Sequence, residues 1–136
     1  MSCKSLLYAT NTTSTLVAEN TQIPLTTIVR RYGCDVNLVG NNAIISESGY
    51  YDITVNATFT APVAGVIGYS IQQDGVNIPG AIGAETITTA TTEVRTITLS
   101  TKVRVKCGSA PSTISLLNGG LAATYSNIAL SVEKAV

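Results

Sequence analysis

The sequence predicts an all-β fold, a sandwich of about ten antiparallel strands. Thr, Val, Ile and Tyr are frequent along the chain, and together they favour strands. No segment keeps a helical apolar period over three turns. Apolar and polar residues alternate most clearly in Gly49–Thr60 and Thr96–Cys107, as on a strand with one face in a core. Short strands at regular spacing, with turn residues between them, are typical of a sandwich or barrel.

Gly49–Thr60 is the strand around which we expect the domain to be organised. It is longer than the usual five or six residues, which favours a central strand over an edge strand. The even positions are polar or amphipathic. The odd positions, which we expect to face the core, are Tyr51, Ile53, Val55, Ala57 and Phe59.

Several shorter elements precede this strand. Ser5–Ala9 is predicted to be a short first strand, and Thr10–Thr15 a polar connector. Gln22–Arg30 contains Ile23, Leu25 and Ile28, and its Pro24 confines that part to an edge or a strand start. Arg30–Gly33 is predicted to be a loop. Asp35–Val39 and Ala43–Ser46 are predicted to form a hairpin around the turn Gly40-Asn41-Asn42.

After the organising strand, Ala61-Pro62 is a strand end and Val66–Gln73 is the next strand. Asp74-Gly75 is the strongest hairpin signal in the chain. It predicts that Gln73 pairs with Val76 and Ile71 with Ile78, and that Pro79-Gly80 closes the hairpin. Ala81–Thr92 is expected to be an irregular strand and a loop.

The C-terminal third contains the remaining strands. In Thr96–Cys107 one face is polar, and the other is predicted to hold Ile97, Leu99, Val103, Val105 and Cys107. Gly108–Pro111 is expected to be a turn. Thr113–Leu117 and Tyr125–Glu133 are expected to form a final pair, joined through Gly119-Gly120.

Composition narrows the classes of function. Charged residues make up 12% of the 136 residues and the formal net charge is zero, so we expect part of the surface to be a subunit interface. Balanced charge argues against nucleic acid as a partner. No run of 18 apolar residues exists, so we expect no membrane span, and the N-terminal apolar run is too short for a signal peptide.

The residue types also argue against enzyme chemistry. The chain contains no histidine, so neither a Ser-His nor a Cys-His pair can form. Acidic residues occur singly, without the spacing of a carboxylate pair or a calcium loop. We therefore expect a non-enzymatic protein with no cofactor and no metal.

Three cysteines, Cys3, Cys34 and Cys107, lack metal-like spacing. Buried or partly buried thiols are the simplest expectation, and a Cys34–Cys107 disulfide is the alternative. Synthesis in the cytoplasm favours the thiols.

Three stretches resemble the jelly-roll family of tumour necrosis factor and the globular head of complement C1q. Ser48–Val55 is similar to the family's Gly-x-Tyr strand, Gln72–Val76 to its mid-chain hairpin, and Tyr125–Leu130 to its closing strand. The resemblance implies a ten-stranded antiparallel jelly-roll over residues 16–136. Residues 1–15 would add a short strand and a polar connector, a possible attachment segment.

The family assembles as homotrimers, and one sheet turns its outer face to the threefold axis. The resemblance implies that Gly49–Thr60, Thr96–Cys107 and the final strand form that sheet. We name its predicted interface residues the contact face: Thr54, Asn56, Thr58, Thr96, Thr98, Ser100, Ala129 and Ser131. An ordinary solvated sheet face is the alternative for the same residues.

A basic row of Lys102, Arg104 and Lys106 follows the same polar face. It is expected either to bind an anion or partner, or to be compensated by Asp52 and Glu133 at the same end of the sheet, and compensation is the favoured interpretation.

The resemblance extends to phage and bacterial proteins. It favours a homotrimeric structural protein of a phage virion, which decorates the capsid or tips a fibre, contacts other virion proteins and is assembled in the bacterial cytoplasm. The alternatives are a head that binds a carbohydrate or receptor and a bacterial surface or spore-coat protein of the same fold. In the head, recognition would fall to Arg30–Tyr32, Asp74–Gly75 and Pro79–Glu85.

Overall fold

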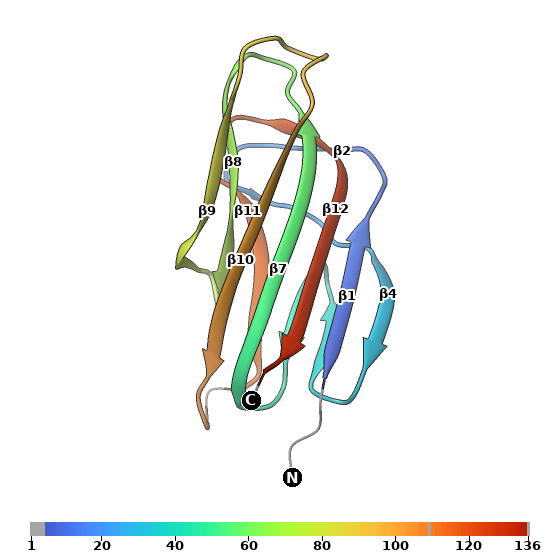
Figure 1. The fold of residues 1–136 in the computed structure, drawn as a ribbon, viewed down its shortest axis with the longest axis vertical. Helices are drawn as coiled ribbons and strands as arrows, with labels where there is room; N and C mark the ends of the chain where they lie inside the picture. The colour runs from blue at the N-terminus through green and yellow to red at the C-terminus, as the bar shows by residue number, and fades with distance from the viewer. Residues whose placement is uncertain (1–4, 109, 136) are drawn as a thin grey trace.

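The computed structural model describes residues 5–108 and 110–135, and in them twelve strands form two antiparallel sheets with no helix (Figure 1). The first six strands are β1 (Leu6–Asn11), β2 (Thr15–Val17), β3 (Thr21–Gln22), β4 (Thr27–Tyr32), β5 (Val36–Val39) and β6 (Asn42–Ile45). The other six are β7 (Gly49–Thr60), β8 (Gly65–Gln73), β9 (Val76–Ile87), β10 (Arg95–Val105), β11 (Ser112–Asn118) and β12 (Ala123–Lys134). The all-β jelly-roll architecture is confirmed, and the short strands β2 and β3 raise the number of strands above the expected ten.

Sheet A has the strand order β10-β7-β12-β1-β4, with β2 paired to β12. Sheet B has the order β5-β6-β11-β8-β9, with β3 paired to β11. Strands adjacent in sequence often lie in opposite sheets, so the chain crosses repeatedly between the two layers. β7 has the predicted bounds and lies inside sheet A, between β10 and β12, which confirms it as a central strand.

The core fills the space between the two sheets. All five odd-numbered apolar residues of β7 have no exposed surface, as their alternation predicted. Ile67, Tyr69 and Ile71 of β8 face them from sheet B and are equally buried. The Tyr69 hydroxyl donates to the Ile97 carbonyl oxygen at 2.7 Å, so this polar atom has a partner inside the core.

Asn118 ties the two sheets together at the end of β11. Its side chain is fully buried, and its Nδ2 donates to the carbonyl oxygens of Val17 at 3.1 Å, Ala18 at 3.2 Å and Leu121 at 3.2 Å. Its Oδ1 accepts from the Tyr125 hydroxyl at 3.1 Å. One amide therefore satisfies the backbone of two connecting segments, which fixes the crossing from β11 to β12.

Two hairpins have the predicted turns, but one register differs. Val39 pairs with Asn42 around Gly40 and Asn41, both of which have positive φ. Gln73 pairs with Val76 as predicted. The expected Ile71–Ile78 pair is wrong, because the register shifts between Ser70 and Gln72. Pro79-Gly80 lies in the resulting bulge rather than closing the hairpin, and β9 continues to Ile87.

The predicted final pair of strands is also wrong. β11 belongs to sheet B, where it pairs with β3, β6 and β8, whereas β12 pairs with β1, β2 and β7 in sheet A. Gly119-Gly120 lies in a crossing between layers, not in a hairpin turn. Alternation identified both strands but could not tell which sheet each one joins, because both sheets present the same inward apolar pattern.

The N-terminal part is more regular than the sequence indicated. The predicted first strand extends to Asn11 and pairs on one side with β12 and on the other with β4. Arg30–Tyr32, expected in a loop, belong to β4, whose residues are exposed throughout. An edge strand open to solvent on both faces has no apolar alternation, which explains the error. The role of residues 1–15 as an attachment segment stays a prediction, and residues 1–4 are not described.

The cysteines differ from the expected buried thiols. Cys34 and Cys107 are both exposed. Cys107 lies beyond the end of β10 in the turn that follows, so it does not join the inner face, and its thiol is free, which excludes the Cys34–Cys107 bridge. Cys3 lies outside the described residues.

Candidate functional site

The contact face is one continuous surface on the outside of sheet A. The register of β7 with β10 places Thr58 opposite Thr96, Asn56 opposite Thr98, and Thr54 opposite Ser100. On the other side of β7, Ala129 lies opposite Asn56 and Ser131 opposite Thr54. The structure therefore brings all eight predicted residues together on the three strands that the resemblance implied.

The polar groups of this face bond to one another across the strands. The hydroxyls of Thr58 and Thr96 lie 3.0 Å apart, and the Thr98 hydroxyl donates to the Asn56 side-chain oxygen. Such cross-strand pairs hold the side chains flat against the sheet. The result is a low surface of small, largely exposed side chains that allows the backbone of another chain to approach closely.

Among the charged residues on the outer face of sheet A, some are paired with an opposite charge and others are not. Lys102 Nζ lies 2.6 Å from Asp52 Oδ1, in the opposite-charge pairing that the sequence favoured. Arg104 instead stacks above the Tyr50 ring, with Cζ 5.8 Å from the centroid. Glu133 lies directly opposite Asp52, so two like charges are neighbours. No ion pair involves Arg104, Lys106 or Glu133 among the described residues. The compensation interpretation thus holds for Lys102 and fails for the other two cations.

A buried ion pair that the sequence analysis missed lies at the end of sheet A. Lys134 Nζ is 3.2 Å from Asp35 Oδ2, and the side chains are 4% and 3% exposed. Glu47 Oε1 lies 3.8 Å from the same nitrogen. Burial alone would raise the pKa of Asp35, but its contacts with Glu47, Cys34, Lys134 and Ser5 outweigh burial and hold that pKa below its usual value. The sequence did contain a sign of this pair. Lys134 is two residues after Val132 in the same strand, so alternation points its side chain toward the interior.

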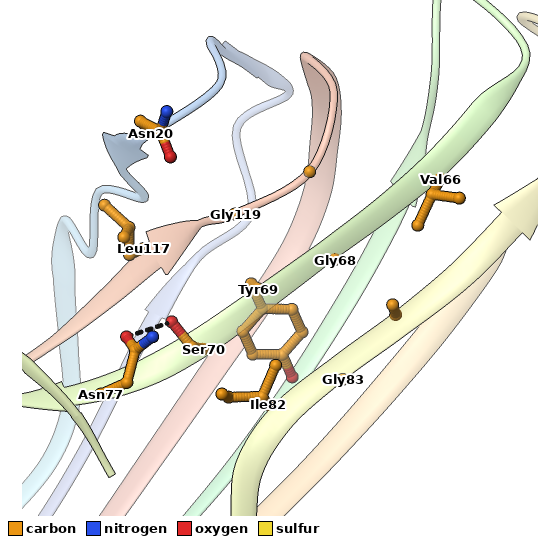
Figure 2. Close-up of a pocket in the computed structure, with 12 residues that line it drawn as sticks. Asn20, Val66, Gly68, Tyr69, Ser70, Asn77, Ile82, Gly83, Leu117 and Gly119 are labelled. Carbon is orange, nitrogen blue, oxygen red and sulfur yellow. Dashed lines mark hydrogen bonds between the residues drawn. The ribbon is translucent and has the colours of Figure 1, made fainter. Parts of the chain in front are cut away.

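The outer face of sheet B carries a shallow recess of about 310 Å³ (Figure 2). Gly68, Gly119 and Gly120 line it, and a Cβ on Gly120 would lie 2.8 Å from the Gly68 nitrogen, so the close approach of these two segments requires glycine at Gly120. The Ser70 hydroxyl donates to Asn77 Oδ1 at 2.9 Å in its wall. The other lining residues are Asn20, Val66, Tyr69, Ile82, Gly83, Ala84 and Leu117.

The described residues contain no group of three or more His, Cys, Asp or Glu placed to hold a metal ion. They also contain no helix long and apolar enough to cross a membrane.

The comparisons with known proteins identify the fold. No protein-family model matches the chain, and no curated protein matches it by sequence. Among solved structures, murine APRIL at pH 8.0 superimposes with a TM-score of 0.70 and 15% identity, covering 98% of this chain and 100% of that one. PRD1 vertex protein P5 gives a TM-score of 0.64 and 18% identity, with 97% of each chain covered. The globular domain of the zebrafish complement 1qA protein gives 0.64 and 4% identity, covering 96% and 95%. The chain therefore has the jelly-roll fold of the tumour necrosis factor and C1q type.

Proposed function

We propose that the protein is a homotrimeric structural component of a phage virion, in which the contact face packs around the threefold axis. The observation that carries the proposal is that the eight predicted residues form one uncharged, low surface on sheet A. Charge is scarce over the chain as a whole, and an interface would remove this face from water. A structural neighbour that is a vertex protein supports a place on a particle, as decoration or fibre head.

Thr54→Glu tests the assembly. Three copies of a new carboxylate would meet around the axis, and like charges in an interface cost several kcal/mol. We expect light scattering to give three times the 14.1 kDa of one chain for the native protein and a smaller mass for the variant. Thr86→Glu is the matched control, because Thr86 is an exposed strand threonine on β9 of sheet B.

Two possible results of this experiment would contradict the proposal. A native mass of one chain at micromolar concentration excludes the trimer. A native trimer that Thr54→Glu leaves intact, with the inner face of β7 still folded, excludes this face as the interface. The particle itself is tested separately by mass spectrometry of purified virions against spores, since a spore-coat protein of the same fold is the alternative location.

A second candidate function, a head that binds a carbohydrate or receptor, is favoured by the recess on sheet B (Figure 2). Ile82, Gly83 and Ala84 line it, and they belong to Pro79–Glu85, the segment expected to carry recognition, although it is strand rather than loop. A glycan array with no binding, together with protein found on particles, would favour the structural role alone.

A further inference from the structure

Two cations at the end of β10, Arg104 in the strand and Lys106 just beyond it, have no role in the assembly proposed above. Lys102, Arg104 and Lys106 share the outer face, but only Lys102 is paired with a carboxylate among the described residues. Arg104 follows Ser100 by four residues, which places it about 13 Å along the strand from the contact face at roughly 3.3 Å per residue. Arg104 is the second-last residue of β10, and β10 and β12 finish at the same end of the sandwich (Figure 1). These charges therefore remain available outside the contact face.

A recess of about 210 Å³ lies beside this pair of cations. No carboxylate lines it, so the two positive charges face its contents directly. Its lining combines the two cations with a hydroxyl, an aromatic ring and exposed backbone. The lining residues are Ser48, Gly49, Tyr50, Arg104, Val105, Lys106 and Cys107.

Tyr50 gives the recess an apolar wall next to the charges. Its side chain is half-exposed, and Arg104 lies over its ring at 5.8 Å. Stacking on the ring restricts the guanidinium, so less conformational entropy is lost when it binds an oxyanion. A ligand with an acid group and an adjacent C–H face matches this combination, and an acidic sugar has both.

We propose that this recess binds the carboxylate of an acidic saccharide. Arg104 and Lys106 contact the carboxylate, and Tyr50 packs against the face of the sugar ring. A single acid group fits better than a polyanion, because the recess on the other side of the same cations is lined by Asp74, which repels a second anion. The volume of about 210 Å³ also favours a sugar ring over an extended acidic peptide.

The experiment is an NMR titration of the intact labelled protein with sialyllactose, and with lactose as the neutral counterpart. We expect sialyllactose, but not lactose, to shift the amides of Tyr50 and Lys106. Arg104→Gln and Lys106→Gln should each weaken binding roughly threefold to tenfold, the effect of losing one charge-assisted contact at an open site. Lys102→Gln is the matched control, because its charge is already paired with Asp52, and it should change affinity less than about twofold.

Four outcomes would overturn the proposal: equal shifts with lactose, equal losses in all three variants, binding of a hexaglutamate peptide without binding of sialyllactose, or the same affinity for sodium sulfate at matched ionic strength. The last two would assign the recess to an acidic protein segment or to a free oxyanion. The mass of the protein, measured on the same samples, keeps a failure here separate from a failure of the trimer.

Discussion

Replacing Lys134 with methionine tests what holds the end of β12 to the segment before β5. The change removes the ammonium group from a pair whose two side chains are almost fully buried, and it leaves Asp35 with an uncompensated charge. Breaking a buried pair in this way costs about 3–5 kcal/mol. Domains of this size are stable by roughly 5–15 kcal/mol, so the variant should lose a large share of its stability. At a urea dependence of about 2 kcal/mol per molar, the midpoint should fall by about 1.5–2.5 M.

The loss of stability in Lys134→Met should depend on pH, and the direction of this dependence follows from the pKa of Asp35. In the native protein its pKa lies below the ordinary value of 3.8, so its contribution is present above that value and is lost as pH falls through the folded pKa. Without Lys134, one of the contacts that lower the pKa of Asp35 is gone, so this pKa rises relative to the native protein. The folded variant then takes up a proton at a higher pH than the folded native protein does, so the stability deficit of the variant should be largest at pH 7 and should shrink toward pH 4.

Urea unfolding at both pH values, at one fixed protein concentration, measures this difference. Lys102→Met is the control, because it breaks an exposed pair and should cost only about 0.2–1 kcal/mol. Adding Asp35→Asn to Lys134→Met should restore part of the loss, since the buried charge is then absent. Equal destabilisation by Lys134→Met at pH 7 and pH 4 would refute the electrostatic reasoning and leave lost packing as the cause.

Two further predictions concern polar groups at other places in the fold. Asn118→Ala should cost about 2–4 kcal/mol in urea unfolding, because three backbone carbonyls and the Tyr125 hydroxyl lose their partner, and a cost below about 1 kcal/mol would contradict its role in the β11–β12 crossing. Glu93 accepts hydrogen bonds from the Thr88 and Thr89 amides and pairs with Arg95. The pKa of Glu93 is lowered to about 2, and the backbone bond from Thr89 is the largest cause. The Thr88 and Thr89 amides should therefore stay protected from hydrogen exchange above pH 4.5 and lose protection as pH falls toward 2, whereas in Glu93→Ala both amides should lack this protection at every pH.

The strands with strict alternation of apolar and polar residues could be predicted from the sequence. Which strands pair with one another could be predicted only in part. The alternation in Gly49–Thr60 predicted both the length of the strand and its buried face, because side chains on a strand with one buried face alternate with a period of two. β4 has no such period, since both of its faces meet solvent, and its arginines therefore suggested a loop. The pairing of β11 failed for another reason. Alternation records which face is buried, but it carries no information about which sheet buries it.

The candidate site shows the same division. The eight residues of the contact face could be placed on one surface because they repeat at a period of two on three strands that the resemblance assigned to one sheet. The recess on sheet B depends on the close approach of Gly68 and Gly120, which come from β8 and from a connection about fifty residues later. The sequence could not show which cations of the basic row are paired with a carboxylate. That depends on the register of β10 with β7, which places Asp52 opposite Lys102 and Tyr50 opposite Arg104.

The exposed strand β4 has a consequence for how copies of this protein can grow into larger structures. It forms one edge of sheet A, and its open ladder could pair with a second copy and continue indefinitely as a fibre. Arg30 and Arg31 stand next to each other on that edge, and Arg31 Nε donates to the Val36 carbonyl oxygen at 2.8 Å, which fastens the edge to the opposite layer. Edge-to-edge pairing would bring these guanidinium groups of two copies together. These charges therefore oppose growth of sheet A into an open polymer through this edge.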